Sequence, residues 1–282
     1  MSLFKKALDA LVGSMKGNDK NIIVKNLNIP SKYLNRAVNV DVFLPPNYRK
    51  GHNSYPTLYF NDGQDMLALG MYDTLTNMYY ANRIPNLIVV AVYSNENRIN
   101  EYGVGGVPDY MNRGNLAGKY TDYLIHELIP YIESEYRCST DHNHRFIAGF
   151  SLGGLSAFDI AWQHPEVFSK VGAFSASFWW RSKALDPKNP DADRIMHTLV
   201  ENSTKKRGLK FWFEVGTNDE TDDRNNNGVI DSIDDTRDII NVLVKKGYHP
   251  HQDIEYNEVD GGEHNPQTWA SVMPDFLMWL FI

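Results

Sequence analysis

The sequence predicts one α/β domain with a mostly parallel central sheet, helices on both of its faces and an antiparallel start. Short apolar runs bounded by turn residues alternate with longer helical patterns, which is typical of strand–helix–strand units. Residues 144–155 combine an apolar strand, a glycine-rich turn and an apolar helix. The 282 residues show no repeat and no break in composition, so a single core is expected.

The elements are expected in the following order. Residues 1–20 are amphipathic and predict an N-terminal helical extension before a domain at 21–282. Strands are predicted at 22–29, 38–44, 57–60, 87–93, 145–149, 170–175, 209–215 and 254–259. Helices are predicted at 119–136, 155–163, 234–246 and 266–280. Because only a short link joins the first two strands, they form the antiparallel start.

Two irregular stretches, at about 94–118 and 177–208, are too long to be simple connections. In a parallel sheet, such insertions follow the carboxyl ends of strands and shape a substrate pocket. We therefore expect both of them to border the functional site.

Composition excludes several classes of function. With 28 basic and 35 acidic residues the net charge is -7, so no basic face is available for nucleic acid. The single cysteine, Cys138, cannot form an internal disulfide and lacks a partner for a zinc site. No run approaches a membrane span or a secretory signal, so a cytoplasmic location is expected, or a periplasmic or secreted one if a signal has been removed. The oligomeric state stays open.

The most informative segment is Gly149-Phe150-Ser151-Leu152-Gly153. It has the form of a nucleophile elbow, a strained strand-to-helix turn that exposes a serine at the end of a strand. The small residues on both sides, together with Gly154, allow such a turn to close. Ser151 is therefore the predicted nucleophile, although a glycine-rich turn without chemistry would have the same pattern.

A serine hydroxyl needs a base, and the base needs an orienting acid. His264 lies in a glycine-rich loop between the last strand and the last helix, the expected setting for the base. The loop after the preceding strand offers Asp219 as the first choice for the acid, then Glu220 and then Asp222. The acid would hold the imidazole tautomer and stabilise the imidazolium.

An oxyanion hole requires two N–H donors. The Leu152 N–H, directly after the nucleophile, is the first candidate. The second is the Gln64 N–H, in the tight turn that follows the strand at 57–60. That turn could equally be an ordinary loop.

The chain resembles the putative esterase family typified by enterochelin esterases, S-formylglutathione hydrolase (esterase D), and feruloyl and acetyl-xylan esterases. The resemblance runs from about residue 20 to the end. It rests on the elbow, His264 and segments 42–48, 62–63, 127–130, 164–168 and 175–179. It implies an α/β-hydrolase fold and carboxylester hydrolysis. One departure is Ala176, where the family usually has proline.

Three further residues are candidates for substrate binding. Trp179 and Trp180 follow a strand end beside the nucleophile, where they could line an acyl or sugar pocket or pack within their own loop. Arg98 begins the other insertion and resembles a family stretch near the site, although a solvated role is also open.

Residues 223–234 match the calcium loop of EF-hands and dockerin modules. Oxygen ligands stand at loop positions 1, 3, 5, 9 and 12, a glycine stands at position 6, and a carbonyl is available at position 7. The predicted ligands are Asp223, Asn225, Asn227, the Val229 carbonyl, Asp231 and Asp234. The alternative is a turn that only caps the following helix. Calcium would be structural, and no cofactor is expected for catalysis.

The leading hypothesis is a serine carboxylesterase with a Ser-His-Asp triad and an acyl-enzyme, acting on a small-molecule or carbohydrate ester, with phenolic and siderophore-like esters also open. One alternative is an acyltransferase that uses the same triad. Another is a non-catalytic, calcium-dependent carbohydrate-binding protein on a hydrolase scaffold.

Overall fold

A computed structural model describes residues 21–282 of the chain, so the extension expected at residues 1–20 lies outside the described residues. Eight strands form one sheet in the order β1-β2-β4-β3-β5-β6-β7-β8. β1 (Ile23–Ser31) and β2 (Arg36–Leu44) are antiparallel, and β2 pairs in the same sense with β4 (Ile88–Val92). The remaining neighbours are parallel, which confirms the predicted class of sheet and its antiparallel start.

The parallel part consists of β4 and five more strands: β3 (Thr57–Asn61), β5 (Arg145–Phe150), β6 (Lys170–Phe174), β7 (Lys210–Asn218) and β8 (Ile254–Glu263). All residues of β3, β4 and β5 are buried, because helices cover both faces of the sheet. β4 shows the alternation: Ile88, Val90 and Val92 pack into one core, and Val89 and Ala91 into the other.

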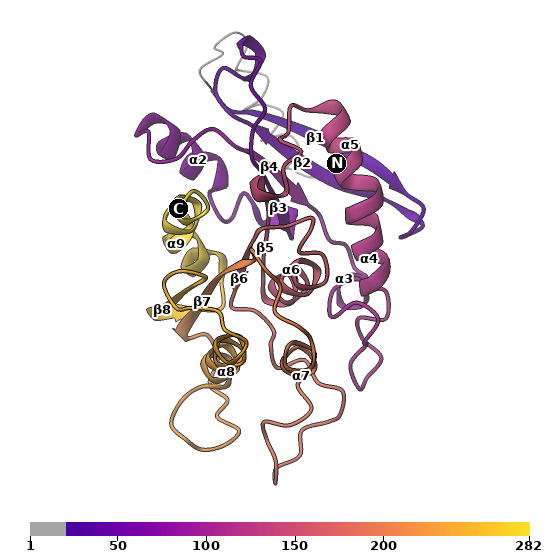
Figure 1. Cartoon of the computed structure of the whole chain (residues 1–282), viewed down its shortest axis with the longest axis vertical. Helices are drawn as coiled ribbons and strands as arrows, with labels where there is room; N and C mark the ends of the chain where they lie inside the picture. Colours follow the sequence, from indigo (N-terminus) through magenta and orange to yellow (C-terminus); the bar gives the residue numbers. More distant parts are fainter. Residues whose placement is uncertain (1–20) are drawn as a thin grey trace.

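The helices divide between the two faces. The first core includes side chains from α4 (Ala117–Tyr123), α5 (Ile129–Glu135), α6 (Ser151–Gln163), α7 (Ile195–Asn202) and α8 (Asp231–Lys245). The second core includes side chains from α2 (Met71–Tyr80) and α9 (Pro266–Trp279). Figure 1 shows α2 and α9 on one side of the sheet and α4, α5 and α6 on the other.

Several elements differ from the sequence prediction. The helix expected at 119–136 contains a π-helical segment, Leu124–Leu128, between α4 and α5. Pro130 follows this segment and cannot donate a backbone hydrogen bond, so a local change of helical register is understandable there. α6 begins at Ser151 itself and not at residue 155. α2 and α7 were not expected, and α7 lies inside the insertion predicted at 177–208.

Shorter helical segments complete the chain: η1 (Tyr48–Lys50), η2 (Gly63–Asp65), α3 (Arg98–Glu101) and η4 (His142–His144). Because β3, β5, β6, β7 and β8 are parallel, their carboxyl ends meet at one edge of the sheet. The segments that follow these ends carry the functional candidates. Within residues 21–282, no helix has the length and apolar character needed to span a membrane.

Candidate active site

The turn from β5 into α6 is sterically tight. Ser151 has φ of 53°, a left-handed conformation that non-glycine residues seldom adopt outside functional sites. A Cβ atom on Gly149 would overlap the Gly153 carbonyl, and one on Gly154 would lie 2.9 Å from the Gly149 carbonyl oxygen. Only glycine fits at these two positions. The local sequence therefore forces Ser151 to the end of the strand, as a nucleophile elbow requires.

His264 and Asp219 come together from neighbouring strands. Asp219 follows β7 and His264 follows β8, and His264 Nδ1 lies 2.9 Å from Asp219 Oδ2. The Asp219 side chain is 2% exposed and that of His264 is 39% exposed, so a buried acid faces an accessible imidazole. Glu220 and Asp222 make no hydrogen bond to His264 within the described residues. The structure thus pairs His264 with the first of the three acid candidates.

Ser151 and His264 are not in direct polar contact among the described residues. Within residues 21–282, no hydrogen bond joins Ser151 Oγ to His264, whereas the Ser151 carbonyl accepts one from Ser177 N–H at 3.1 Å. Catalytic hydrogen bonds are often long without substrate and shorten in the reacting complex. The serine and the histidine–acid pair nevertheless lie at the same edge of the sheet.

Two residues near the acid carry roles that the sequence analysis did not assign. Ser175, directly after β6, donates from Oγ to Asp219 Oδ1 at 2.8 Å. Trp269 of α9 donates from Nε1 to the same serine oxygen at 3.0 Å. These residues lie 44 and 94 positions apart from their partners in the sequence, so no local pattern could reveal the contacts.

Glu214 of β7 lies close to Asp219 and is completely buried. Neither of its carboxyl oxygens has a hydrogen-bond partner in the described residues. Burial, reinforced by the charge of Asp219, raises the pKa of Glu214 to about 8. Glu214 is therefore a neutral carboxylic acid at neutral pH.

The oxyanion candidates occupy suitable backbone positions. Leu152 is the second residue of α6, so its N–H has no partner within the helix. Gln64 lies in η2, and its hydrogen bonds within the described residues all use its side chain, which leaves its backbone N–H without an acceptor there. Both groups can donate to an added oxygen.

Asp62 organises the turn that contains Gln64. Its buried carboxylate accepts hydrogen bonds from Ser94 Oγ at 2.9 Å and from Gln64 Nε2 at 3.0 Å. Arg98 binds the same carboxylate through Nε and Nη2, both at 2.7 Å. Arg98 was expected either to bind substrate or to be solvated. Instead its guanidinium is committed to Asp62, because a buried carboxylate needs a charged partner.

The two tryptophans have different environments. Trp179 is 40% exposed, whereas Trp180 is fully buried. The guanidinium of Arg113 lies over both rings, 5.5 Å and 5.0 Å from their centres. Trp180 takes the alternative environment given for it, since its buried ring packs between the two insertions against Gly103 and Gly114. Trp179 remains a candidate.

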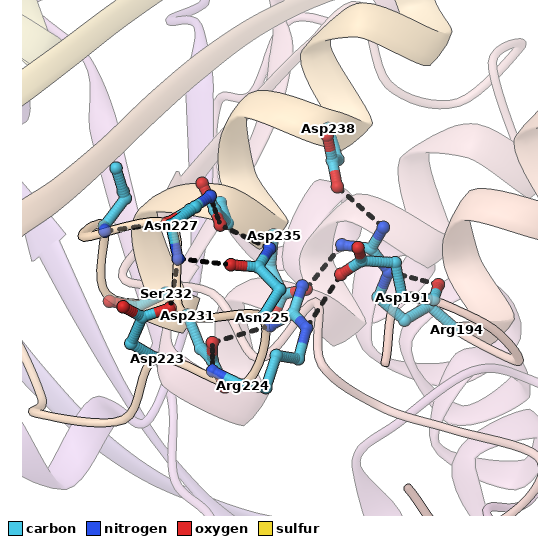
Figure 2. A network of polar contacts seen from close by, with 12 residues as sticks. Asp191, Arg194, Asp223, Arg224, Asn225, Asn227, Asp231, Ser232, Asp235 and Asp238 are labelled. Atoms are coloured by element: carbon cyan, nitrogen blue, oxygen red, sulfur yellow. Dashed lines mark hydrogen bonds and ion pairs between the residues drawn. The ribbon is translucent and has the colours of Figure 1, made fainter. Parts of the chain in front are cut away.

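The predicted calcium loop contains two polar groupings (Figure 2). In the first, Asp234 Oδ2 accepts from Asn227 Nδ2 at 2.7 Å and from Asn225 Nδ2 at 3.2 Å, while Asp223 accepts from the Asn227 and Gly228 N–H groups. In the second, Asp231 Oδ1 accepts from the Arg224 N–H at 2.8 Å.

Arg224 draws Asp231 away from the other ligand candidates. Its guanidinium pairs with Asp231, with Asp191 at 2.9 Å and with Asp235 at 2.7 Å. Arg194 pairs with the same Oδ1 oxygen of Asp235 and with Asp238, both at 2.6 Å. Across residues 21–282, no three His, Cys, Asp or Glu side chains gather closely enough to hold a metal. The loop thus brings four predicted ligand side chains together and holds the fifth against an arginine.

Comparison with known proteins identifies relatives over most of the chain. The family model described as "Putative esterase" matches residues 31–280. The uncharacterized protein YbbA of Bacillus subtilis is 22% identical over 244 residues, which cover 85% of this chain and 91% of that protein. The diacylglycerol acyltransferase/mycolyltransferase Ag85A of Mycobacterium leprae is 23% identical over 305 residues, covering 95% and 87%. The solved structure of a ferulic acid esterase superposes with a TM-score of 0.72 at 21% identity, covering 92% of this chain and 98% of that one.

Proposed function

The chain belongs to the putative esterase family and is a carboxylic ester hydrolase of the α/β-hydrolase fold, and on this premise we propose that it works through an acyl-enzyme on Ser151. The observation that carries the proposal is the strained Ser151 elbow at the same sheet edge as the paired His264 and Asp219. A strained serine beside an accessible, oriented imidazole is suited to nucleophilic catalysis.

The proposed reaction has two halves. Ser151 Oγ attacks the ester carbonyl while His264 takes its proton, and the resulting oxyanion accepts hydrogen bonds from the Leu152 and Gln64 N–H groups. His264 then gives the proton to the departing alcohol, which leaves an acyl group on Ser151. Water, deprotonated by His264, attacks this acyl-enzyme; the bond to Ser151 Oγ breaks, His264 returns the proton to that oxygen, and the acid is released. Asp219 stabilises the imidazolium in both halves.

Hydrolysis of short p-nitrophenyl esters tests this assignment. We expect Ser151→Ala and His264→Ala each to abolish turnover with the fold intact, because each removes a member of a unit whose effects do not add. Asp219→Asn should lower kcat by about 10⁴-fold. A variant of Ser151 or His264 that keeps more than about a tenth of the activity contradicts the triad. A large loss in Glu220→Gln with a small one in Asp219→Asn would transfer the acid role to Glu220.

The acyl acceptor and the acyl group are separate questions. The similarity to a mycobacterial acyltransferase supports a second candidate function, in which a hydroxyl compound replaces water in the second half. Adding alcohols or sugars during turnover distinguishes the two, since a transferase forms a new ester in preference to free acid. A panel of feruloyl, acetyl-xylan, cyclic siderophore and S-formylglutathione esters would define the substrate. Complete inactivity towards p-nitrophenyl acetate and this panel would favour the non-catalytic alternative.

We also propose that loop 223–234 binds calcium as a structural ion. Asp223, Asn225, Asn227 and Asp234 supply a carboxylate and amide oxygen set, which is the donor chemistry that calcium prefers. Gly228 has φ of +85°, which allows the sharp turn at the sixth position of such a loop. Because Asp231 is paired with Arg224, a cation would have to compete with a guanidinium for the ninth-position ligand. Modest affinity is expected for this reason.

A further inference from the structure

The two oxygens of the Asp219 carboxylate have different partners. Oδ2 faces His264 Nδ1 at 2.9 Å, and Oδ1 faces Ser175 Oγ at 2.8 Å. The same Ser175 oxygen lies 3.0 Å from Trp269 Nε1. Ser175 is 4% exposed and Trp269 is 6% exposed, so water has little access to these bonds. One hydrogen-bonded chain therefore runs from the indole of α9 to the imidazole of His264.

The direction of this chain follows from the chemistry of its members. An indole nitrogen can only donate, so Ser175 Oγ must accept from Trp269. A serine hydroxyl has one proton, and an ionised carboxylate can only accept. The Ser175 proton therefore points to Asp219 Oδ1. With that oxygen occupied, Oδ2 is the one presented to the histidine.

The same reasoning fixes the tautomer of His264. The ionised Asp219 has no proton to give, so the hydrogen bond at Oδ2 requires the proton to be on His264 Nδ1. The neutral ring then has its lone pair on Nε2. This is the nitrogen that a serine hydrolase uses to take the proton from its nucleophile.

Ser175 and Trp269, the two members of this hydrogen-bonded chain beyond Asp219, are firmly held. Ser175 has φ of 41°, a strained conformation, and its N–H donates to the Glu214 carbonyl at 2.7 Å. The Trp269 ring stacks on Phe150, the residue before the nucleophile, with ring centres 4.4 Å apart and planes at 9°. The edge-to-face contact of Trp269 with His264, at 5.3 Å, links the same ring to the base.

We infer that Ser175 and Trp269 are positioning residues that orient the Asp219 carboxylate and thereby fix the reactive tautomer of His264. Within residues 21–282, neither residue hydrogen-bonds to Ser151 or His264, so their polar effect on the base passes through Asp219, while the Trp269 ring also packs against the imidazole. The inference rests on the proposed function, because it assigns a role only if His264 and Asp219 serve Ser151. It makes the helix α9 indole part of the catalytic framework.

The test compares kcat and KM of Ser175→Ala and Ser175→Gly with those of the parent protein, using a p-nitrophenyl ester. We expect kcat to fall by about 10–100-fold, the range typical for outer partners that orient a functional histidine, with KM within about twofold. The glycine variant relieves the strain of the positive φ, so a loss of activity in it cannot be ascribed to a weakened fold. The ¹⁵N chemical shifts of the His264 ring should show a single Nδ1–H tautomer in the parent and a mixture in both variants.

Trp269→Phe keeps an aromatic ring against Phe150 and removes the indole donor together with the volume of the second ring. It should lower kcat less than Ser175→Ala does, because the freed hydroxyl still reaches Asp219. The double variant should lose no more than Ser175→Ala alone, because Trp269 acts through Ser175. Ser169→Ala is the matched control, since Ser169 is a buried serine at the opposite end of β6, and it should leave kcat unchanged.

Three results would overturn the inference in different ways. If kcat and the His264 tautomer are unchanged in both Ser175 variants while Ser151→Ala is inactive, Ser175 and Trp269 do not position Asp219. The proposed function then still stands. If the losses of kcat in Ser175→Ala and Trp269→Phe add in the double variant, Trp269 does not act through Ser175. Activity retained in Ser151→Ala removes the proposed function and the inference with it.

Discussion

The buried carboxyl of Glu214 makes stability depend on pH in a way that one substitution can isolate. An acid whose pKa is about 8 in the folded protein and near its ordinary value of 4.5 in the unfolded chain favours folding only while it stays protonated. Below pH 4.5 Glu214 is protonated in both the folded and the unfolded state, and the free energy of unfolding is not reduced. As the pH rises from 4.5 to 8, the unfolded state alone ionises, and the free energy of unfolding falls.

The size of the effect follows from the two pKa values. The difference of about 3.5 pKa units corresponds to about 5 kcal/mol in full, at about 1.4 kcal/mol for each unit. At pH 7 the loss amounts to about 3 kcal/mol. Glu214→Gln replaces the acid by a neutral group of similar shape and removes this dependence. Its stability relative to the parent should therefore rise by about 1 kcal/mol for each pH unit between 5 and 8.

Urea unfolding at pH 5, 6, 7 and 8, followed by tryptophan fluorescence, measures both proteins under the same conditions. Contributions of other titrating groups cancel in the difference, and any packing cost of glutamine adds a constant that does not vary with pH. Glu135→Gln, at an exposed position, controls for the substitution itself. A difference between parent and Glu214→Gln that stays constant from pH 5 to 8 refutes the reasoning.

Three further predictions concern the surroundings of the nucleophile and the loop after β7. Gly153→Ala places a Cβ atom 2.5 Å from Asp62 Oδ2. We expect a loss of about 1–3 kcal/mol in urea unfolding, and a lower kcat because the turn that contains Gln64 is displaced. A fully active, equally stable variant contradicts this. Arg98→Ala leaves the buried Asp62 carboxylate without its bidentate partner, which should cost about 3–5 kcal/mol of stability and lower kcat through the freed Gln64 turn, as thermal melts and kinetics would show. If loop 223–234 binds calcium in the folded state only, calcium at ~100 times Kd stabilises the protein by about 2.7 kcal/mol. Chelator then lowers Tm and causes only a partial loss of activity. Identical melting curves of metal-free protein with and without calcium would show that the loop only caps the following helix.

The local features of this fold could be predicted from the sequence because each depends on a few neighbouring residues. All eight strands were expected within a few residues of their observed ends, since continuous apolar runs mark strands buried on both faces. The two longer helices that were missed have weaker signals. α2 contains one asparagine, two threonines and three tyrosines, and α7 has only eight residues between polar flanks.

The features that could not be predicted depend on contacts between residues that are far apart in the sequence. Nothing in the doublet Trp179-Trp180 distinguishes a ring open to solvent from a ring in the core, because the buried ring of Trp180 packs against Gly103 and Gly114 of the other insertion. The same holds for Ser175, whose partners lie in β7's following loop and in α9. The sequence favoured Asp219 over Glu220 and Asp222 but left all three open, because the contact with His264 depends on the pairing of β7 with β8.

Among the contacts that fasten the insertion at residues 94–118 to the candidate active site, three stand out. Arg98 binds Asp62 beside the oxyanion turn, the Gly103 N–H donates to Ser156 Oγ at 2.8 Å, and the Gly105 N–H donates to Asp159 Oδ2 at 2.8 Å. Ser156 and Asp159 both belong to α6, the helix that begins at Ser151. A loop of this kind cannot be exchanged freely to obtain new specificity. A graft from a relative must keep the arginine and the two backbone contacts, or altered recognition will come at the expense of turnover.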